Sequence, residues 1–165
     1  MLFQYKHDKI KTVISMNENR TLFLQQAKAL IESETDFIAN LANISSLLKE
    51  FYQEKCSWAG FYLFKDEMLV LGPFQGKPAC TRIQLGKGVC GTAAKTRKTQ
   101  IVPDVHQFEG HIACDGGSNS EIVVNVIQHD TVVAVIDLDS YQFNTFTQED
   151  ADMLEALAEL VKELF

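Results

Sequence analysis

The spacing of apolar residues changes along the chain from a helical period to an alternating one and back again. Apolar side chains first recur every three or four positions, which predicts two amphipathic helices, over residues 21–33 and from a cap at Thr35 onward. They then alternate with polar residues, as in half-buried strands. The predicted strands span residues 57–64, 68–73, 81–85, 100–103, 121–128 and 132–139. A short helix over residues 92–96 interrupts them, and a last helix begins at a Thr147 cap with Asp150 three residues on.

This order of elements predicts an α+β fold with an antiparallel sheet, because hairpins dominate and no βαβ repeat occurs. The length of 165 residues and the apolar content of 46% are typical of one domain with a full core. Residues 1–20 are polar and weakly periodic. We interpret them as an N-terminal extension and residues 21–165 as a single domain.

One face of the predicted sheet gathers carboxylates and aromatic rings. Successive side chains of a strand point to opposite faces, so Asp137 shares a face with Asp139, and Trp58 shares one with Tyr62. Glu121 lies on the polar face of its own strand, under the long irregular segment that precedes it. Covering these carboxylates would cost solvation and repulsion, which a cationic ligand group beside an aromatic wall would offset. The alternative interpretation is an ordinary solvated surface.

Three of the four cysteines, Cys80, Cys90 and Cys114, lie in segments predicted as loops or as the start of the short helix. Cys56 instead stands at the entry to a strand, which is typical of a small buried hydrophobe. Amides and the helix dipole at the start of the short helix would stabilise a thiolate at Cys90. Two neighbouring thiols suit reduction of a two-electron oxidised substrate: one attacks and becomes a sulfenic acid, and the second resolves it as a disulfide.

A zinc site is the alternative interpretation of the same three cysteines. His106 and His111 could add ligands. None of the three cysteines stands within a few positions of another, however, so the close pairs of structural zinc sites are lacking. We therefore expect no metal.

The net charge and the lack of long apolar segments limit which partners and which cellular compartment we expect. The formal net charge is −7, which disfavours nucleic acid and anionic membrane as partners. The first residues contain no apolar signal-peptide core, and no stretch reaches the length of a membrane helix. We expect a cytoplasmic protein, in which cysteines are reduced and buried or else reactive.

Several motifs fall in the order that is characteristic of one enzyme family. They are Ser57-Trp58-Ala59-Gly60-Phe61-Tyr62, Gly72-Pro73-Phe74-Gln75-Gly76, Gly86-Lys87-Gly88-Val89-Cys90-Gly91, Val102-Pro103-Asp104-Val105, His111-Ile112-Ala113-Cys114-Asp115 and Ser118-Asn119-Ser120-Glu121-Ile122-Val123-Val124. From about Leu22 to its end, the chain resembles the free methionine-R-sulfoxide reductases, which are GAF-domain enzymes. The resemblance implies a GAF fold, with helices on one face of an antiparallel sheet and a ligand pocket on the other. It also implies reduction of free L-methionine (R)-sulfoxide, thioredoxin as external reductant with no bound cofactor, and a homodimer.

The resemblance also implies a role for each cysteine. Cys114 would be the attacking nucleophile, Cys80 the main resolving thiol and Cys90 an auxiliary one. This differs from helix electrostatics, which alone nominates Cys90.

The remaining site residues that the resemblance implies would bind the substrate. Trp58 and Tyr62 would line the pocket around the methyl sulfoxide. Glu121, Asp137 and Asp139, with Asp104 nearby, would hold the amino group or protonate the departing oxygen. A carboxylic acid beside the thiolate is needed for that protonation, and Asp139 or Glu121 is expected to supply it.

Two departures from the family pattern affect only local strand geometry: Asn125 and Tyr141 stand where proline is expected. Two other functions remain open on the sequence. A non-catalytic GAF sensor of a small ligand would leave the set of three cysteines unexplained, and a thiol redox switch without a specific substrate would leave the acidic face unexplained.

Overall fold

Six strands pair into one antiparallel sheet in the order β3-β2-β1-β6-β5-β4. The computed structural model describes residues 2–112, 114 and 116–165; Ala113 and Asp115 of the quoted motif lie outside the described residues. The strands are β1 (Trp58–Lys65), β2 (Met68–Gln75), β3 (Arg82–Gln84), β4 (Gln100–Val102), β5 (Ser120–Gln128) and β6 (Thr131–Ser140). The helices are α1 (Leu2–Ser33), α2 (Phe37–Tyr52), α3 (Gly88–Thr96) and α4 (Gln148–Val161), with single 3-10 turns η1 (Gln53–Lys55), η2 (Val105–Gln107) and η3 (Lys162–Leu164).

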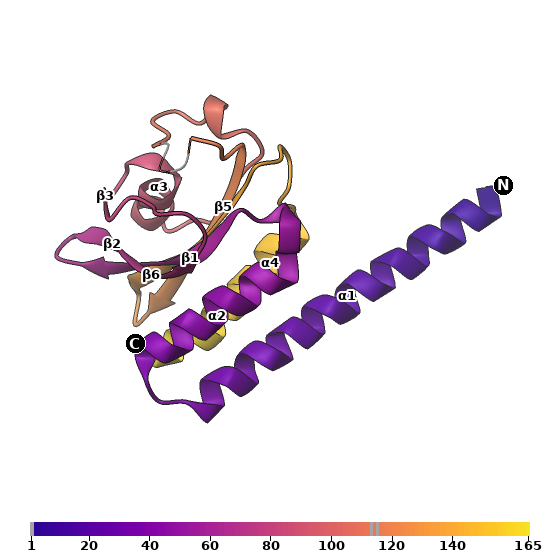
Figure 1. Cartoon of the computed structure of the whole chain (residues 1–165), viewed down its shortest axis with the longest axis horizontal. Helices are drawn as coiled ribbons and strands as arrows, with labels where there is room; N and C mark the ends of the chain where they lie inside the picture. The colour runs from indigo at the N-terminus through magenta and orange to yellow at the C-terminus, as the bar shows by residue number, and fades with distance from the viewer. Residues whose placement is uncertain (1, 113, 115) are drawn as a thin grey trace.

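The two faces of the sheet have separate cores. Helices α2 and α4 cover one face, and the C-terminal part of α1 packs alongside them, whereas α3 lies over the opposite face (Figure 1). On the first face, alternate residues of the central strands, such as Phe61, Ile122 and Leu138, are fully buried among the helices. Their neighbours Trp58 and Tyr62 join the second core beneath α3. This is the α+β arrangement that the alternating pattern predicts, and the packed helices leave the opposite face for a site.

Strand β2 corrects one sequence prediction. The strand was expected to end at Pro73, but it continues to Gln75. The pairing with β1 shifts at this point, so that two residues of β2 lie opposite the single residue Phe61. Such a bulge accommodates a proline that has no amide hydrogen for the ladder.

Helix α1 is longer than expected: it begins at Leu2 rather than at Thr21. No glycine or proline occurs in the first 33 residues, so nothing local ends the helix even where the apolar period is weak. The helix therefore crosses the boundary expected at residue 20, while the division into extension and domain stays a prediction. In the described part of the chain, no helix is long and apolar enough to cross a membrane.

A buried carboxylate fixes α1 and α2 to the start of α4. Asp150 accepts hydrogen bonds from Arg20 and from the Tyr52 hydroxyl, each at 3.1 Å, through its Oδ1. Its Oδ2 accepts from the Thr147 amide and hydroxyl, each at 2.9 Å, which completes the capping box predicted from the sequence. These four residues are called the Asp150 network below.

Candidate active site

A small cavity lies under α3, on the sheet face that the alternation pattern selected. Its volume is about 30 Å³. Of the residues expected at the site, those that line the cavity are Trp58, Tyr62, Cys90, Cys114, Glu121, Asp137 and Asp139. The chain thus brings together most of the residues that the sequence nominated.

Strand register accounts for the position of the carboxylates. Glu121 of β5 lies directly opposite Asp139 of β6. Asp137 lies two residues before Asp139, on the same face of β6. In the pairing of β6 with β1, the residue opposite Asp137 is Gly60. A Cβ added to Gly60 would lie 2.4 Å from the Phe74 Cβ. Because this close crossing of β1 and β2 permits no side chain, Asp137 has no side-chain neighbour at its β1 partner position.

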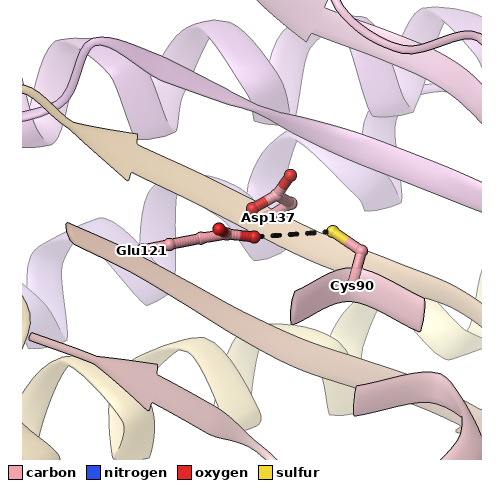
Figure 2. A group of neighbouring side chains, drawn as sticks. All are labelled: Cys90, Glu121 and Asp137. Atoms are coloured by element: carbon pink, nitrogen blue, oxygen red, sulfur yellow. Dashed lines mark hydrogen bonds between the residues drawn. The ribbon is translucent and has the colours of Figure 1, made fainter. Parts of the chain in front are cut away.

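Cys90, Glu121 and Asp137 form a tight group inside this site (Figure 2). They come from α3, β5 and β6, and all three are buried. The Cys90 thiol donates a hydrogen bond to Glu121 Oε1 over 3.9 Å. Within the part of the chain that the structure describes, Asp137 Oδ1 is buried and has no hydrogen-bond partner.

This environment keeps protons on the group. Burial, followed by the negative charges of Asp137 and Asp139, raises the pKa of Glu121 well above its usual value. Burial and Asp139 do the same to the pKa of Asp137. Burial, followed by the negative charges of Asp137 and Glu121, also raises the pKa of the Cys90 thiol well above its usual value. The expectation of a Cys90 thiolate at a helix start is therefore wrong, since this helix start is packed against carboxylates rather than exposed.

Cys80 and Cys114 are joined by a disulfide, with their Cα atoms 5.3 Å apart. Cys80 lies in the loop between β2 and β3, and Cys114 lies in the segment before β5. Both are half-buried, and Cys114 lines the cavity. The disulfide joins the two cysteines to which the resemblance gave attack and resolution, and Cys114 lines the same cavity as Glu121, Asp137 and Asp139, whereas Cys80 does not line it. A zinc site built from three cysteines is not assembled in the described chain.

The fourth cysteine behaves as the sequence predicted. Cys56 is buried in the core between the sheet and the helices, and its thiol donates to the Trp58 carbonyl oxygen over 2.9 Å. Burial raises its pKa to about 12. Cys56 therefore packs in the core and is not part of the disulfide.

Stacked aromatic rings form one wall of the cavity. The Trp58 ring stacks on Tyr62, with centroids 5.9 Å apart, and on Phe74 at 5.2 Å. Its indole Nε1 donates to the Lys77 carbonyl oxygen over 3.1 Å, which fixes the ring orientation. Phe74 was not identified from the sequence as a residue that supports the Trp58 ring, although Phe74 is part of the Gly72–Gly76 motif. The glycine and proline of that motif hid the fact that the strand continues through it.

His111 is a second residue whose place the sequence did not predict. Its Nε2 lies 3.9 Å from Glu121 Oε2, and it lines the cavity. Burial, and then His106, lower the pKa of His111, so the imidazole is neutral near pH 7 and can hydrogen-bond without adding charge. From the sequence, His111 was considered only as a zinc ligand. Its position three residues before Cys114 was the one feature that could have indicated a place beside the cavity.

Asp104 does not join the described lining of the cavity. Its carboxylate caps η2, accepting from the His106 amide over 3.0 Å and from Gln107 Nε2 over 2.7 Å. His106 in turn contacts Asn119 Oδ1 at 3.0 Å. Asp104 therefore holds the segment that leads to the site rather than facing the cavity.

Comparison with known proteins supplies the family. A GAF domain model matches residues 35–164. The free methionine-R-sulfoxide reductase of Escherichia coli is 53% identical over 137 residues, which cover 82% of each chain. The reductase of the same name from Saccharomyces cerevisiae is 45% identical over 160 residues, covering 90% of this chain and 89% of the relative. The X-ray structure of free methionine-R-sulfoxide reductase from Neisseria meningitidis in complex with its substrate is 41% identical, with a TM-score of 0.84, and the match covers 88% of this chain and 89% of that one.

Proposed function

Because the chain belongs to the free methionine-R-sulfoxide reductases of the GAF-domain family, we propose that it reduces free L-methionine (R)-sulfoxide to methionine at the cavity described above. The observation that carries the proposal is the Cys80–Cys114 disulfide, which borders a buried acidic group and an aromatic wall. A disulfide at this place is the product expected of a thiol reductase after one turnover.

In the proposed reaction, the Cys114 thiolate attacks the sulfur of the sulfoxide. The oxygen, protonated by an acid in the cavity, then moves from the substrate sulfur to the Cys114 sulfur. The sulfur–oxygen bond of the substrate and the transient bond between the two sulfurs break, so that Cys114 becomes a sulfenic acid and methionine is released. The Cys80 thiol then attacks the Cys114 sulfur, which forms the disulfide and releases water. Two electrons have passed from the two thiols to the substrate, and no bound cofactor is needed.

A proton on the sulfoxide oxygen makes its sulfur electrophilic, so the reaction needs an acid in the cavity. Glu121 suits this role, because burial and its acidic neighbours raise its pKa and keep it protonated at higher pH. Hydrogen bonding from Cys90 and the approach of His111 to the two Glu121 oxygens would fix its orientation. Cys90 thus acts in this scheme through Glu121, as a positioning residue.

The substrate would lie between the aromatic wall and the acidic face. Its methyl group would contact Trp58 and Tyr62, and its ammonium group would neutralise the carboxylates of Asp137 and Asp139. A free amino acid brings such an ammonium group, whereas a methionine sulfoxide inside a peptide does not. This difference would restrict the enzyme to the free amino acid.

The cavity volume of about 30 Å³ is enough for about one water molecule and much too small for an amino acid. The site with the disulfide formed is therefore closed to substrate. Reduction of the disulfide would release the segment that carries Cys114 and open the cavity. Thioredoxin is the proposed reductant, acting in the cytoplasm on a homodimer, as the family resemblance implies.

The test compares three substrates with the purified protein, thioredoxin and its recycling system: free methionine-R-sulfoxide, the free S epimer and a peptide-bound sulfoxide. Turnover of the free R epimer alone is expected. If none of the three sulfoxides is reduced, the proposal is refuted. Cys114→Ser should abolish even the first turnover, whereas Cys80→Ser should leave the first turnover and block recycling. Cys56→Ser is the matched control and should leave both unchanged.

A further inference from the structure

Three side chains with metal-ligating atoms converge in the cavity from three different elements. The Cys90 sulfur and one carboxylate oxygen each from Glu121 and Asp137 all lie within 4.8 Å of one another (Figure 2). Their exposed fractions are 3%, 6% and 5%, so the group is almost completely shielded from solvent. A cluster this compact needs little movement to surround a single ion.

A second observation indicates that the group can accept a cation. Among the described residues, none donates a hydrogen bond to the buried Asp137 Oδ1, although Asp137 lines the cavity. An acceptor in this state is costly unless a proton or a cation reaches it. The adjoining space of about 30 Å³ matches one ion or one water molecule.

We infer that Cys90, Glu121 and Asp137 form a binding site for a borderline-soft divalent cation of the Zn²⁺ class. One thiolate and two carboxylate oxygens supply three protein ligands and leave a fourth position open. The thiolate favours zinc over magnesium or calcium, which take oxygen ligands. The proton that Cys90 now donates to Glu121, and those held by the Glu121 and Asp137 carboxyls, would pass to solvent when the metal binds.

His111 would act from outside this ligand set. Its Nε2 lies 3.9 Å from Glu121 Oε2, where a small movement would let it hydrogen-bond to the ligating carboxylate. A cation held at Glu121 and Asp137 would exclude the substrate ammonium group and inhibit the enzyme. That consequence rests on the proposed function, whereas the metal site itself does not.

The test uses Co²⁺ as a spectroscopic probe on full-length protein that carries Cys80→Ser and Cys114→Ser. This variant has only Cys56 and Cys90 as thiols, cannot form the disulfide and needs no added thiol that would itself bind metal. A thiolate-to-cobalt charge-transfer absorption should appear, saturate at one Co²⁺ per chain and disappear when Zn²⁺ is added. Adding Cys90→Ser should remove the absorption, and adding Cys56→Ser should retain it.

Absence of the absorption in the starting variant would overturn the inference, as would its persistence after Cys90→Ser. A second variant keeps the test decisive if Cys90→Ser does not fold. Glu121→Gln preserves the thiol and should weaken Co²⁺ binding by at least about tenfold, since even residues outside a ligand set cost that much. Unchanged affinity in Glu121→Gln would exclude the carboxylate as a ligand.

Discussion

Replacing Asp137 by asparagine should stabilise the folded protein while it removes a carboxylate from the proposed site. Asp137 is 5% exposed, and its Oδ1 has no hydrogen-bond partner among the described residues. Asparagine has nearly the same shape but carries no charge. The substitution therefore tests whether the acidic face costs stability that the site requires for binding.

The size of the effect follows from the burial of this carboxylate. Burial and Asp139 raise the pKa of Asp137 in the folded state above its unfolded value, which is about 4. Below the unfolded pKa the carboxyl is neutral in both states and costs nothing. As the pH rises from there through the folded pKa, stability is lost. Each unit by which the folded-state pKa exceeds the unfolded one costs about 1.4 kcal/mol once the pH is above both values. Because the pKa of Asp137 is raised well above its usual value, Asp137→Asn should gain at least about 1.4 kcal/mol of free energy of unfolding near pH 8 and almost none near pH 4.

Urea denaturation with the Cys80–Cys114 disulfide intact measures this gain. The single tryptophan, Trp58, is buried, so its fluorescence reports unfolding. Asp152→Asn on the exposed side of α4 is the matched control and should stay within about 0.5 kcal/mol of the parent. An Asp137→Asn protein that is less stable than the parent near pH 8, or whose gain does not shrink as the pH falls, would refute the reasoning.

Three other predictions concern the frame around the site. Asp150→Ala should lower the free energy of unfolding, measured by urea denaturation, by about 3–5 kcal/mol, because it removes the acceptor of the Asp150 network. The control Asp152→Ala on the same helix should lower it by less than about 0.5 kcal/mol. Equal losses in the two variants would contradict this prediction. With the disulfide intact, native Cys56 and Cys90 should resist iodoacetamide near pH 8 because burial raises the pKa of both thiols, and mass spectrometry should find both alkylated only after unfolding. Gly91→Ala would place a Cβ 2.3 Å from a backbone carbonyl oxygen and should lower the free energy of unfolding by at least about 1–3 kcal/mol; an unchanged melting temperature would disprove that close contact.

The acidic face could be predicted from the sequence because a strand has a strict period of two. Once Ile122 and Leu138 are assigned to the helix-covered core, their neighbours Glu121, Asp137 and Asp139 must lie on the opposite face. The hairpin that joins β5 and β6 fixes their register, so no long-range information was needed. The same holds for the order of the elements and for the cap of α4.

The state of Cys90 could not be predicted in this way. A helix start looks the same in sequence whether it faces solvent or a buried carboxylate, and only the packing of α3 on β5 and β6 decides between them. The cap that Asp104 forms was hidden for a related reason: the sequence shows that this residue is near the site, but only the structure shows that its carboxylate caps η2. Helix α1 shows a third limit, since its N-terminal part has no apolar stripe for a pattern to detect.

In the proposed mechanism, the closed cavity beside the disulfide sets the order of events in each catalytic cycle. Methionine is far larger than the space that remains once Cys80 and Cys114 are joined, so it must depart before the disulfide forms. Product inhibition by methionine should therefore fall on the dithiol enzyme alone. The oxidised enzyme holds no methionine while it awaits its reductant. A high methionine concentration in the cell would therefore not slow reduction of the disulfide.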